Sequence, residues 1–198
     1  MEFILNEPDG GPPRAAAVIC HPHPLYGGTL HTRIVYQTAQ VMLGLGWPVL
    51  RFNFRGVGRS AGAYDHGRGE QADARAAMAY LRSLYPVPLT LTGFSFGAMV
   101  VARLLAAEAP AEVARAVLLG LPVDREEIPA DWKWRGPKLM ISGERDEFAS
   151  VAGLNAYFAR LAEPKACVWI PGGDHFMAPR LDQYRSALRL GLVAMLAG

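Results

Sequence analysis

The chain has few of the residues that mark disulfide-rich, metal-binding or nucleic-acid-binding proteins. Its two cysteines, Cys20 and Cys167, have no CxxC partner and no histidine at zinc-finger spacing, which argues against a disulfide framework or a zinc site. Both lie in apolar segments, where a cysteine usually packs as a small hydrophobic side chain. The 20 basic and 18 acidic residues are spread along the chain without a basic block, so no nucleic-acid partner is expected.

Long hydrophobic runs are also absent. No apolar run reaches the roughly 18 residues that a membrane span requires. Residues 1–8 lack the positively charged start and the sustained apolar stretch of a signal peptide. We therefore expect a cytoplasmic protein without a membrane span. Hydrophobic residues nevertheless make up 51% of the chain, which is enough for the core of a single domain over residues 1–198.

The sequence does contain a regular alternation of short apolar segments and longer segments of helical period. Six apolar segments are predicted strands, with a seventh at an edge over 2–5: 15–20, 48–53, 89–93, 115–119, 138–142 and 166–170. Helices are expected over 29–43, 70–84, 97–107, 150–161 and 181–196. Strands that are apolar throughout are buried on both faces, which indicates a parallel sheet between helices. This order predicts a doubly wound α/β fold with binding groups at the carboxyl ends of the strands.

The segment Gly93–Gly97, with the sequence Gly-Phe-Ser-Phe-Gly, lies where a predicted strand gives way to a predicted helix. A serine at such a corner sits on a strained turn, and the flanking glycines let two backbones pass closely. The Ser95 hydroxyl would then face the solvent side of the sheet as a nucleophile. The alternative is an ordinary Gly-Ser turn between a strand and a helix.

A second candidate segment, residues 21–28, follows the first long strand, contains two prolines and ends in two glycines. Proline fixes φ and removes a backbone donor, so the N–H groups of His23, Leu25 and Tyr26 are held in place and could face a developing oxyanion. The alternative is a turn whose histidines bind local carbonyl groups. His21 and His23 have no third metal-binding residue nearby in sequence, so no metal is expected there.

A third segment, Asn53–Ser60, has the sequence Asn-Phe-Arg-Gly-Val-Gly-Arg-Ser. It lacks the third glycine of a dinucleotide-binding fingerprint and follows the second main strand. We therefore expect a scaffold loop and no cofactor. Arg55 in this loop would either line the site or tie loops together, and the second role is expected.

Over nearly its whole length, the chain resembles the small, cap-less α/β-hydrolases of the bacterial dienelactone-hydrolase-like kind. The resemblance implies an α/β-hydrolase fold with a mostly parallel sheet of about seven strands, helices on both faces and no cap domain. The segments that carry it are His21–Gly28, Asn53–Ser60, Gly93–Gly97, Gly143–Asp146 and Gly173–His175.

The resemblance also implies the roles of three residues. Ser95 would be the nucleophile, Asp146 the acid and His175 the base, in the chain order that this fold requires. The chain departs from the family pattern in two places. Dienelactone hydrolases carry a cysteine nucleophile where this chain has a serine, and Ala149 and Ser150 stand where a proline often follows the acid.

Chemistry supports a serine nucleophile independently of the family. A serine hydroxyl needs a base to remove its proton, and the base needs an acceptor that fixes its tautomer. His175 follows the last predicted strand after two glycines, so it is the histidine best placed to reach Ser95. The oxyanion would be held by the N–H of Phe96 together with that of Leu25 or Tyr26.

Other charged residues compete for these roles. Asp146 follows a predicted strand, and its alternative role is that of a helix N-cap or turn former. Asp174 is adjacent in sequence to the proposed base, which makes it hard for its carboxylate to fold back onto the same ring, and Glu144 is the other rival. His31, at a predicted helix start, and His66, in a polar loop, are expected at the surface.

The expected substrate site is open, because residues 120–137 are too few for a cap. Seven aromatic side chains could form an apolar rim for acyl or aryl groups: Tyr26, Phe94, Phe96, Trp132, Trp134, Phe148 and Phe176. The alternative is that the two tryptophans are packing anchors or a dimer contact, so a homodimer is left open.

Two classes of function are compatible with these features. The first is a metal-independent serine esterase that cleaves small acyl esters, with an amidase or peptidase as the related alternative. The second is a binding module that keeps the fold and a vestigial site. An intact serine, acid and histidine in order favours the enzyme.

Overall fold

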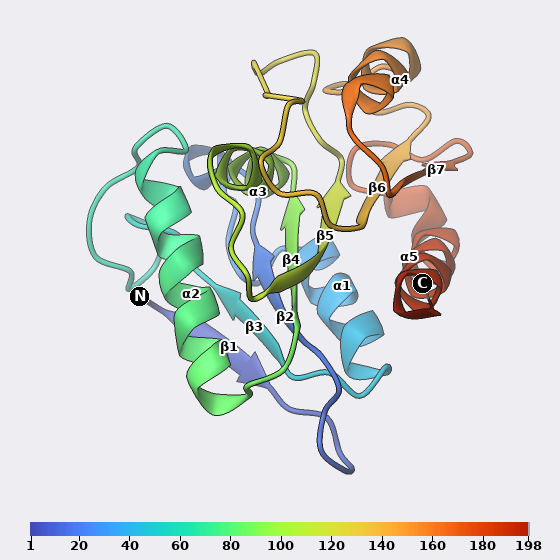
Figure 1. Ribbon diagram of the computed structural model, residues 1–198. Coiled ribbons are helices and arrows are strands. Elements are labelled where there is room, and N and C mark those ends of the chain that lie inside the picture. The colour runs from blue at the N-terminus through green and yellow to red at the C-terminus, as the bar shows by residue number, and fades with distance from the viewer. Residues whose placement is uncertain (198) are drawn as a thin grey trace.

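The computed structural model describes residues 1–197, in which a seven-stranded sheet lies between two layers of helices (Figure 1). The strands lie in the order β1-β3-β2-β4-β5-β6-β7; β1 is antiparallel to β3, and every other neighbouring pair is parallel. Their bounds are β1 Phe3–Asn6, β2 Ala16–Cys20, β3 Val49–Phe52, β4 Leu89–Phe94, β5 Val113–Leu119, β6 Lys138–Gly143 and β7 Lys165–Ile170. All seven predicted strands are confirmed, with β1 at the edge.

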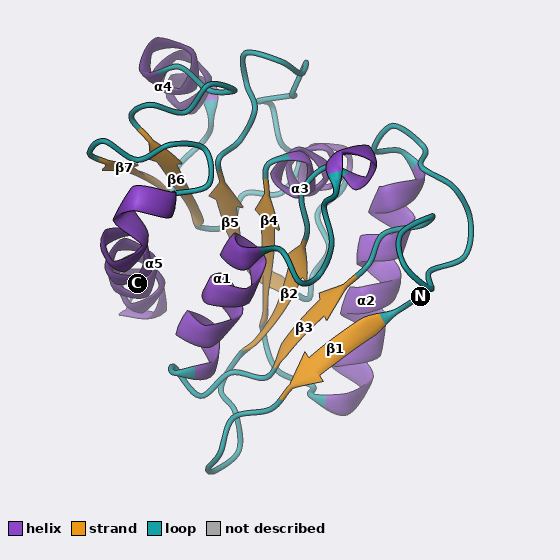
Figure 2. Ribbon diagram, turned by 180° about the vertical axis from the view of Figure 1, so that it is seen from behind, coloured by secondary structure: helices purple, strands orange, loops and turns teal. Residues whose placement is uncertain are grey.

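Five α-helices cover the sheet within the described residues: α1 Arg33–Leu43, α2 Gly69–Leu84, α3 Phe96–Ala107, α4 Val151–Arg160 and α5 Leu181–Ala197. α1 and α5 pack on one face, in front of the sheet in Figure 2, and α2, α3 and α4 lie over the other. The strands β2 to β6 are almost fully buried because both of their faces pack against helices. The predicted α/β architecture is therefore confirmed.

The first helix begins later than predicted, at Arg33 rather than at Thr29. The N–H of Leu30 donates to Asn53 Oδ1 at 2.8 Å, which holds this backbone in a turn outside the helix. Thr32 then adopts an extended conformation with ψ of 132° and ends the turn. A hydrogen bond to an acceptor 23 positions away therefore set the helix boundary, which the helical periodicity did not reveal.

Parallel pairing brings the carboxyl ends of the strands to one edge of the sheet. Cys20 at the end of β2 pairs with Gly93 near the end of β4, and Gly143 at the end of β6 pairs with Ile170 at the end of β7. The loops that follow these strands therefore leave the sheet side by side. Residues 120–137, between β5 and β6, contain no helix or strand, in agreement with the expected absence of a cap. No helix among residues 1–197 is long and apolar enough to cross a membrane.

Candidate active site

Ser95 lies in the sharp turn between β4 and α3, and its φ of 55° is one that residues other than glycine rarely adopt. Gly93 and Gly97 make this turn possible. A Cβ atom at Gly93 would lie 2.2 Å from the carbonyl oxygen of Gly97, and one at Gly97 would lie 2.3 Å from that of Cys20. Only glycine therefore lets α3 begin directly against the end of β2, with Ser95 at the top of the turn.

The imidazole of His175 is hydrogen-bonded to Asp146. Its Nδ1 lies 2.9 Å from both carboxylate oxygens, and both side chains are buried. The carboxylate also accepts the Ser142 hydroxyl at 3.2 Å and the Phe148 N–H at 2.9 Å. Because Nδ1 carries the hydrogen that binds the carboxylate, the Nε2 atom of the ring is left to accept a proton.

Aromatic rings hold the His175 ring in place. Its centroid lies 5.0 Å from the ring of Phe94, 4.5 Å from that of Phe148 and 5.2 Å from that of Phe176. Gly120 leaves room for the imidazole, since a Cβ atom there would lie 3.2 Å from His175 Cε1. The histidine is 2% exposed, so its orientation is fixed by packing as well as by the hydrogen bond to Asp146.

The other acidic residues near this ring bind backbone groups instead. Asp174 accepts the N–H of Ala178 at 3.0 Å, and Glu144 accepts the N–H of Gly172 at 3.2 Å. Neither carboxylate is hydrogen-bonded to His175. Of the three acidic residues considered from the sequence, the structure places only Asp146 behind the imidazole.

In the loop after β2, two of the three N–H groups predicted as possible oxyanion donors have partners within the loop. The N–H of Leu25 donates to His23 Nδ1 at 3.2 Å, and the N–H of Tyr26 donates to the His23 carbonyl oxygen at 3.1 Å. Both groups are used to close the short 3₁₀ helix Pro24–Tyr26, so neither is available for an oxyanion. Within residues 1–197, the N–H groups of His23 and Phe96 have no hydrogen-bond partner.

His21 lies beneath this loop and is completely buried. Its Nδ1 donates to the carbonyl oxygen of Pro22 at 2.6 Å, and its Nε2 accepts the N–H of Phe54 at 3.0 Å. Burial lowers the pKa of His21 to about 4, because the low dielectric disfavours the imidazolium. His21 therefore ties the β2 and β3 loops together as a neutral side chain.

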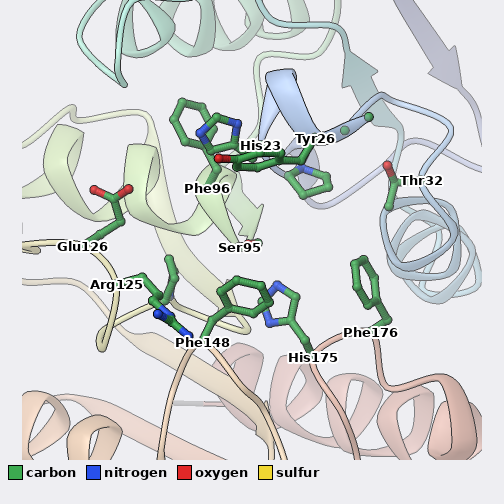
Figure 3. Close-up of a pocket in the computed structure, with 14 residues that line it drawn as sticks. His23, Tyr26, Thr32, Ser95, Phe96, Arg125, Glu126, Phe148, His175 and Phe176 are labelled. Carbon is green, nitrogen blue, oxygen red and sulfur yellow. The ribbon is translucent and has the colours of Figure 1, made fainter.

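Ser95, Phe96 and His175 line one cavity of about 540 Å³ at this edge of the sheet, shown in Figure 3. No hydrogen bond engages the Ser95 hydroxyl within residues 1–197, and Ser95 and His175 line the same cavity. Most of the lining is apolar or aromatic, with Arg125 and Glu126 on the side nearest Phe148 and Phe96. The remaining lining residues are Pro22, His23, Tyr26, Gly27, Gly28, Thr32, Pro122, Phe148 and Phe176.

The aromatic rim is smaller than predicted. Tyr26, Phe96, Phe148 and Phe176 line the cavity, but Phe94 is buried below His175. Trp132 and Trp134 are 2% and 5% exposed, and their indole N–H groups donate to the carbonyl oxygens of Pro129 and Val113. The two tryptophans are therefore packing anchors, which was the alternative considered from the sequence.

Further predictions concern Arg55, His31 and His66, which lie outside the cavity. Arg55 makes an ion pair with Asp73 at 2.9 Å, so it has the expected structural role but ties its loop to α2 rather than to another loop. His31 and His66 are exposed, as predicted. Among residues 1–197, no three His, Cys, Asp or Glu side chains gather as a metal site would require.

Sequence reasoning missed several residues of the site. Ser142 lies on β6 four positions before Asp146, and only this spacing hinted that its hydroxyl would support the carboxylate. Tyr64 approaches His23 from a loop 41 positions away, for which the sequence carries no signal. Gly120 accommodates the imidazole from the end of β5, where a glycine is too common to be diagnostic.

Comparisons with known proteins give a consistent picture. A family profile described as an alpha/beta hydrolase domain matches residues 26–190. The chain is 34% identical to an α/β serine hydrolase without lid from Xanthomonas campestris, with a TM-score of 0.87 over 97% of this chain and 88% of that one. It is 32% identical to an α/β serine hydrolase homologue from Coxiella burnetii, with a TM-score of 0.88 over 96% and 90% of the two chains. An uncharacterized protein of Rickettsia prowazekii is 29% identical over 98% of this chain and 89% of its own length.

Proposed function

This chain belongs to the alpha/beta hydrolase family, and on that basis we propose that it is a serine hydrolase that cleaves small acyl esters. The observation that carries the proposal is the buried hydrogen bond between His175 and Asp146 beside a cavity that Ser95 also lines. A histidine oriented by a carboxylate is the base that a serine nucleophile needs.

In the first half of the reaction, the Ser95 oxygen attacks the ester carbonyl carbon and its proton passes to Nε2 of His175. Asp146 stabilises the imidazolium that forms, because its carboxylate accepts the Nδ1 hydrogen. The N–H groups of His23 and Phe96 donate to the oxyanion of the tetrahedral intermediate. Collapse breaks the ester C–O bond, and the imidazolium returns the proton to the departing alcohol.

The second half uses the same residues with water. His175 removes a proton from a water molecule as the water oxygen attacks the acyl group on Ser95. The new tetrahedral intermediate places its oxyanion against the same two N–H groups. Collapse then releases the carboxylic acid and returns the proton to the Ser95 oxygen, so the enzyme needs no metal or cofactor for this cycle.

The shape of the cavity supports a small substrate. Its volume is about 540 Å³, within the range of sites that hold small molecules. Residues 120–137 add no helix or strand that could close over it. Since an extended chain would leave most of its length in water, short acyl groups are the favoured substrates.

The proposal is tested by treating the folded protein with a fluorophosphonate, followed by peptide mapping. Label on Ser95, with Ser95→Ala remaining unlabelled, supports the proposed nucleophile. Hydrolysis of p-nitrophenyl acetate should accompany labelling and persist in EDTA. Absence of label on Ser95 in correctly folded protein would favour a binding module that has lost its catalytic role.

A second measurement separates ester from amide cleavage. The esters and anilides of the same short acyl groups are compared at equal concentration, because the two series differ only in the leaving group. Turnover of the esters alone supports an esterase. Comparable rates for the anilides would point to the amidase or peptidase alternative, since both reactions use the same acyl-transfer groups.

A further inference from the structure

Three backbone N–H groups of the loop after β2 converge on His23. Leu25 donates to its Nδ1 at 3.2 Å, and Tyr26 and Gly28 both donate to its carbonyl oxygen at 3.1 Å. The loop is tight as well, because a Cβ atom at Gly28 would lie 2.2 Å from the Pro22 carbonyl oxygen. The conformation of residues 23–28 therefore depends on the side chain and the backbone carbonyl group of His23.

The ring of His23 also joins the loop to two other parts of the chain. Its centroid lies 5.0 Å from the ring of Phe96 and 5.1 Å from that of Tyr64. Its Nε2 lies 3.2 Å from the Tyr64 hydroxyl. Because Nδ1 accepts the N–H of Leu25, the hydrogen is on Nε2, which therefore donates to that hydroxyl.

These contacts link the two proposed oxyanion donors. One donor is the backbone N–H of His23, and the other is that of Phe96, whose ring packs directly on the imidazole. Figure 3 shows the rings of His23, Tyr26 and Phe96 gathered on the side of the cavity opposite His175 and Phe148. A shift of the imidazole would thus change the position of one donor relative to the other.

We propose that His23 is a positioning residue for the oxyanion site. Its ring, bonded to the N–H of Leu25 and to the Tyr64 hydroxyl, fixes the backbone N–H of His23 opposite that of Phe96. The inference rests on the proposed function, because an oxyanion forms only if Ser95 attacks an acyl group. Neither ring nitrogen of His23 touches substrate in this role.

The neutral form of the ring is the one that can do this. Protonation would place a hydrogen on Nδ1 and remove the acceptor for Leu25. The titratable and charged groups around the ring are Glu70, Glu126, His66, Tyr26, Tyr64 and Arg103. Glu126 and Glu70 raise the pKa of His23, but burial has the larger effect and lowers the pKa from its usual value. The lowered pKa favours the neutral ring at pH 7.

Three variants test the role of the ring. His23→Phe keeps an aromatic ring against Phe96 but removes both nitrogen atoms, so kcat should fall about 30-fold with KM within about twofold, since loss of one oxyanion donor costs about 10²-fold or more. His23→Asn restores a short acceptor for the Leu25 N–H and should recover about tenfold of that loss. Tyr64→Phe removes only the hydroxyl and should lower kcat about threefold. His31→Phe, outside the cavity, is the matched control and should leave kcat unchanged.

The readouts separate positioning from a merely structural role. Circular dichroism and thermal melts establish that each variant is folded, and if His23→Phe does not fold, Tyr64→Phe and His23→Asn carry the test. A loss of kcat with constant KM and rescue by asparagine supports the inference. Unchanged kcat in His23→Phe and Tyr64→Phe overturns it while leaving the proposed function intact. A wild-type protein that neither hydrolyses esters nor reacts at Ser95 overturns both.

Discussion

The two sides of the cavity are fixed in different ways. On the base side, His175 and Asp146 are 2% and 6% exposed and are enclosed by aromatic rings. On the oxyanion side, Leu25 and Tyr26 are 66% and 86% exposed. There, hydrogen bonds to His23 hold the loop in place, whereas on the base side burial holds the side chains.

In the proposed mechanism, this difference follows from what each side has to do. A carboxylate can stabilise an imidazolium most strongly where water is excluded, because the local dielectric is low. Under the same proposal, the oxyanion side must instead admit the substrate, so it cannot be covered. Its loop is therefore held by short-range bonds within the chain, and substitutions on the two sides should have different consequences.

The largest expected effect lies on the base side. Asp146→Asn should lower kcat by about 10⁴-fold, because asparagine has no negative charge to stabilise the imidazolium and can present its N–H to Nδ1, which leaves the imidazole in the wrong tautomer. The measurement is steady-state hydrolysis of p-nitrophenyl acetate by protein with wild-type circular dichroism. Such a loss would exceed the change expected for His23 variants by more than a hundredfold.

Two neighbouring acidic residues provide matched controls for Asp146. Asp174→Asn and Glu144→Gln should each change kcat by less than about tenfold, because their carboxylates bind the N–H groups of Ala178 and Gly172. Near-normal turnover in Asp146→Asn combined with a severe loss in either control would show that Asp146 is not the acid. Ser95 and His175 would still stand in that case.

The next effect concerns stability at the point where the two sides meet. Gly97→Ala should lower the free energy of unfolding by about 3 kcal/mol or more, because the new Cβ would lie within 3 Å of backbone atoms of Cys20 and His21. Urea denaturation measures the change. Gly44→Ala is the control, since its φ is −66° and its nearest neighbour is 3.4 Å away. Equal stability of the two variants would mean that the turn between β4 and α3 can widen without loss of stability.

A pH-dependent effect is expected beneath the oxyanion loop. The folded-state pKa of His21 is about 4, against a usual value of 6.5, so the unfolded chain binds the proton more readily. The stability from the neutral ring is present above pH 6.5 and is lost as the pH falls toward 4, by up to about 3 kcal/mol.

This window can be tested by substitution. In His21→Gln, the unfolding free energy should vary less between pH 6.5 and 4 than in the wild type, whereas exposed His31→Gln should keep the wild-type slope. Urea denaturation at several pH values gives both slopes. A slope in His21→Gln equal to that of the wild type would assign the acid sensitivity to other groups.

The smallest expected effect concerns the oxyanion side, where the cavity is open to solvent. The kcat/KM for p-nitrophenyl laurate should not exceed that for the acetate and butyrate, because an uncovered cavity cannot bury the added methylene groups, each of which would contribute about 0.8 kcal/mol if buried. A series of p-nitrophenyl esters below their critical micelle concentrations measures this. Activity that keeps rising to the longest chain would show that the oxyanion side encloses more of the substrate than its exposure indicates.

The sequence predicted the order of the elements well because each strand carries its own signal. A run such as Ala16–Cys20 is apolar at every position, and only a strand buried on both faces requires that. The Gly-Phe-Ser-Phe-Gly turn was equally recognisable from its two glycines. The turn requires them, because a Cβ atom at either position would lie too close to the backbone. Patterns within a few neighbouring residues were sufficient in both cases.

The oxyanion loop and the tryptophans show where such patterns stop being sufficient. The prolines indicated that residues 21–28 are stiff, but not that His23 accepts the N–H groups of Leu25 and Tyr26. The spacing of Trp132 and Trp134 fitted a cavity rim and a packing anchor equally. Their partners, Pro129 and Val113, were decided by how residues 120–137 lie against β5 and α4.

The sequence by itself determined the alternation of strands and helices, the strained turn at Ser95 and the order of serine, acid and histidine, because each depends on local residue types. Only the tertiary structure decided which carboxylate lies behind His175 and which N–H groups remain for an oxyanion. These depend on distances between loops. An example is the 2.9 Å from His175 Nδ1 to Asp146 Oδ1, in residues 29 positions apart. Such distances arise from packing around the whole sheet, and no local pattern encodes them.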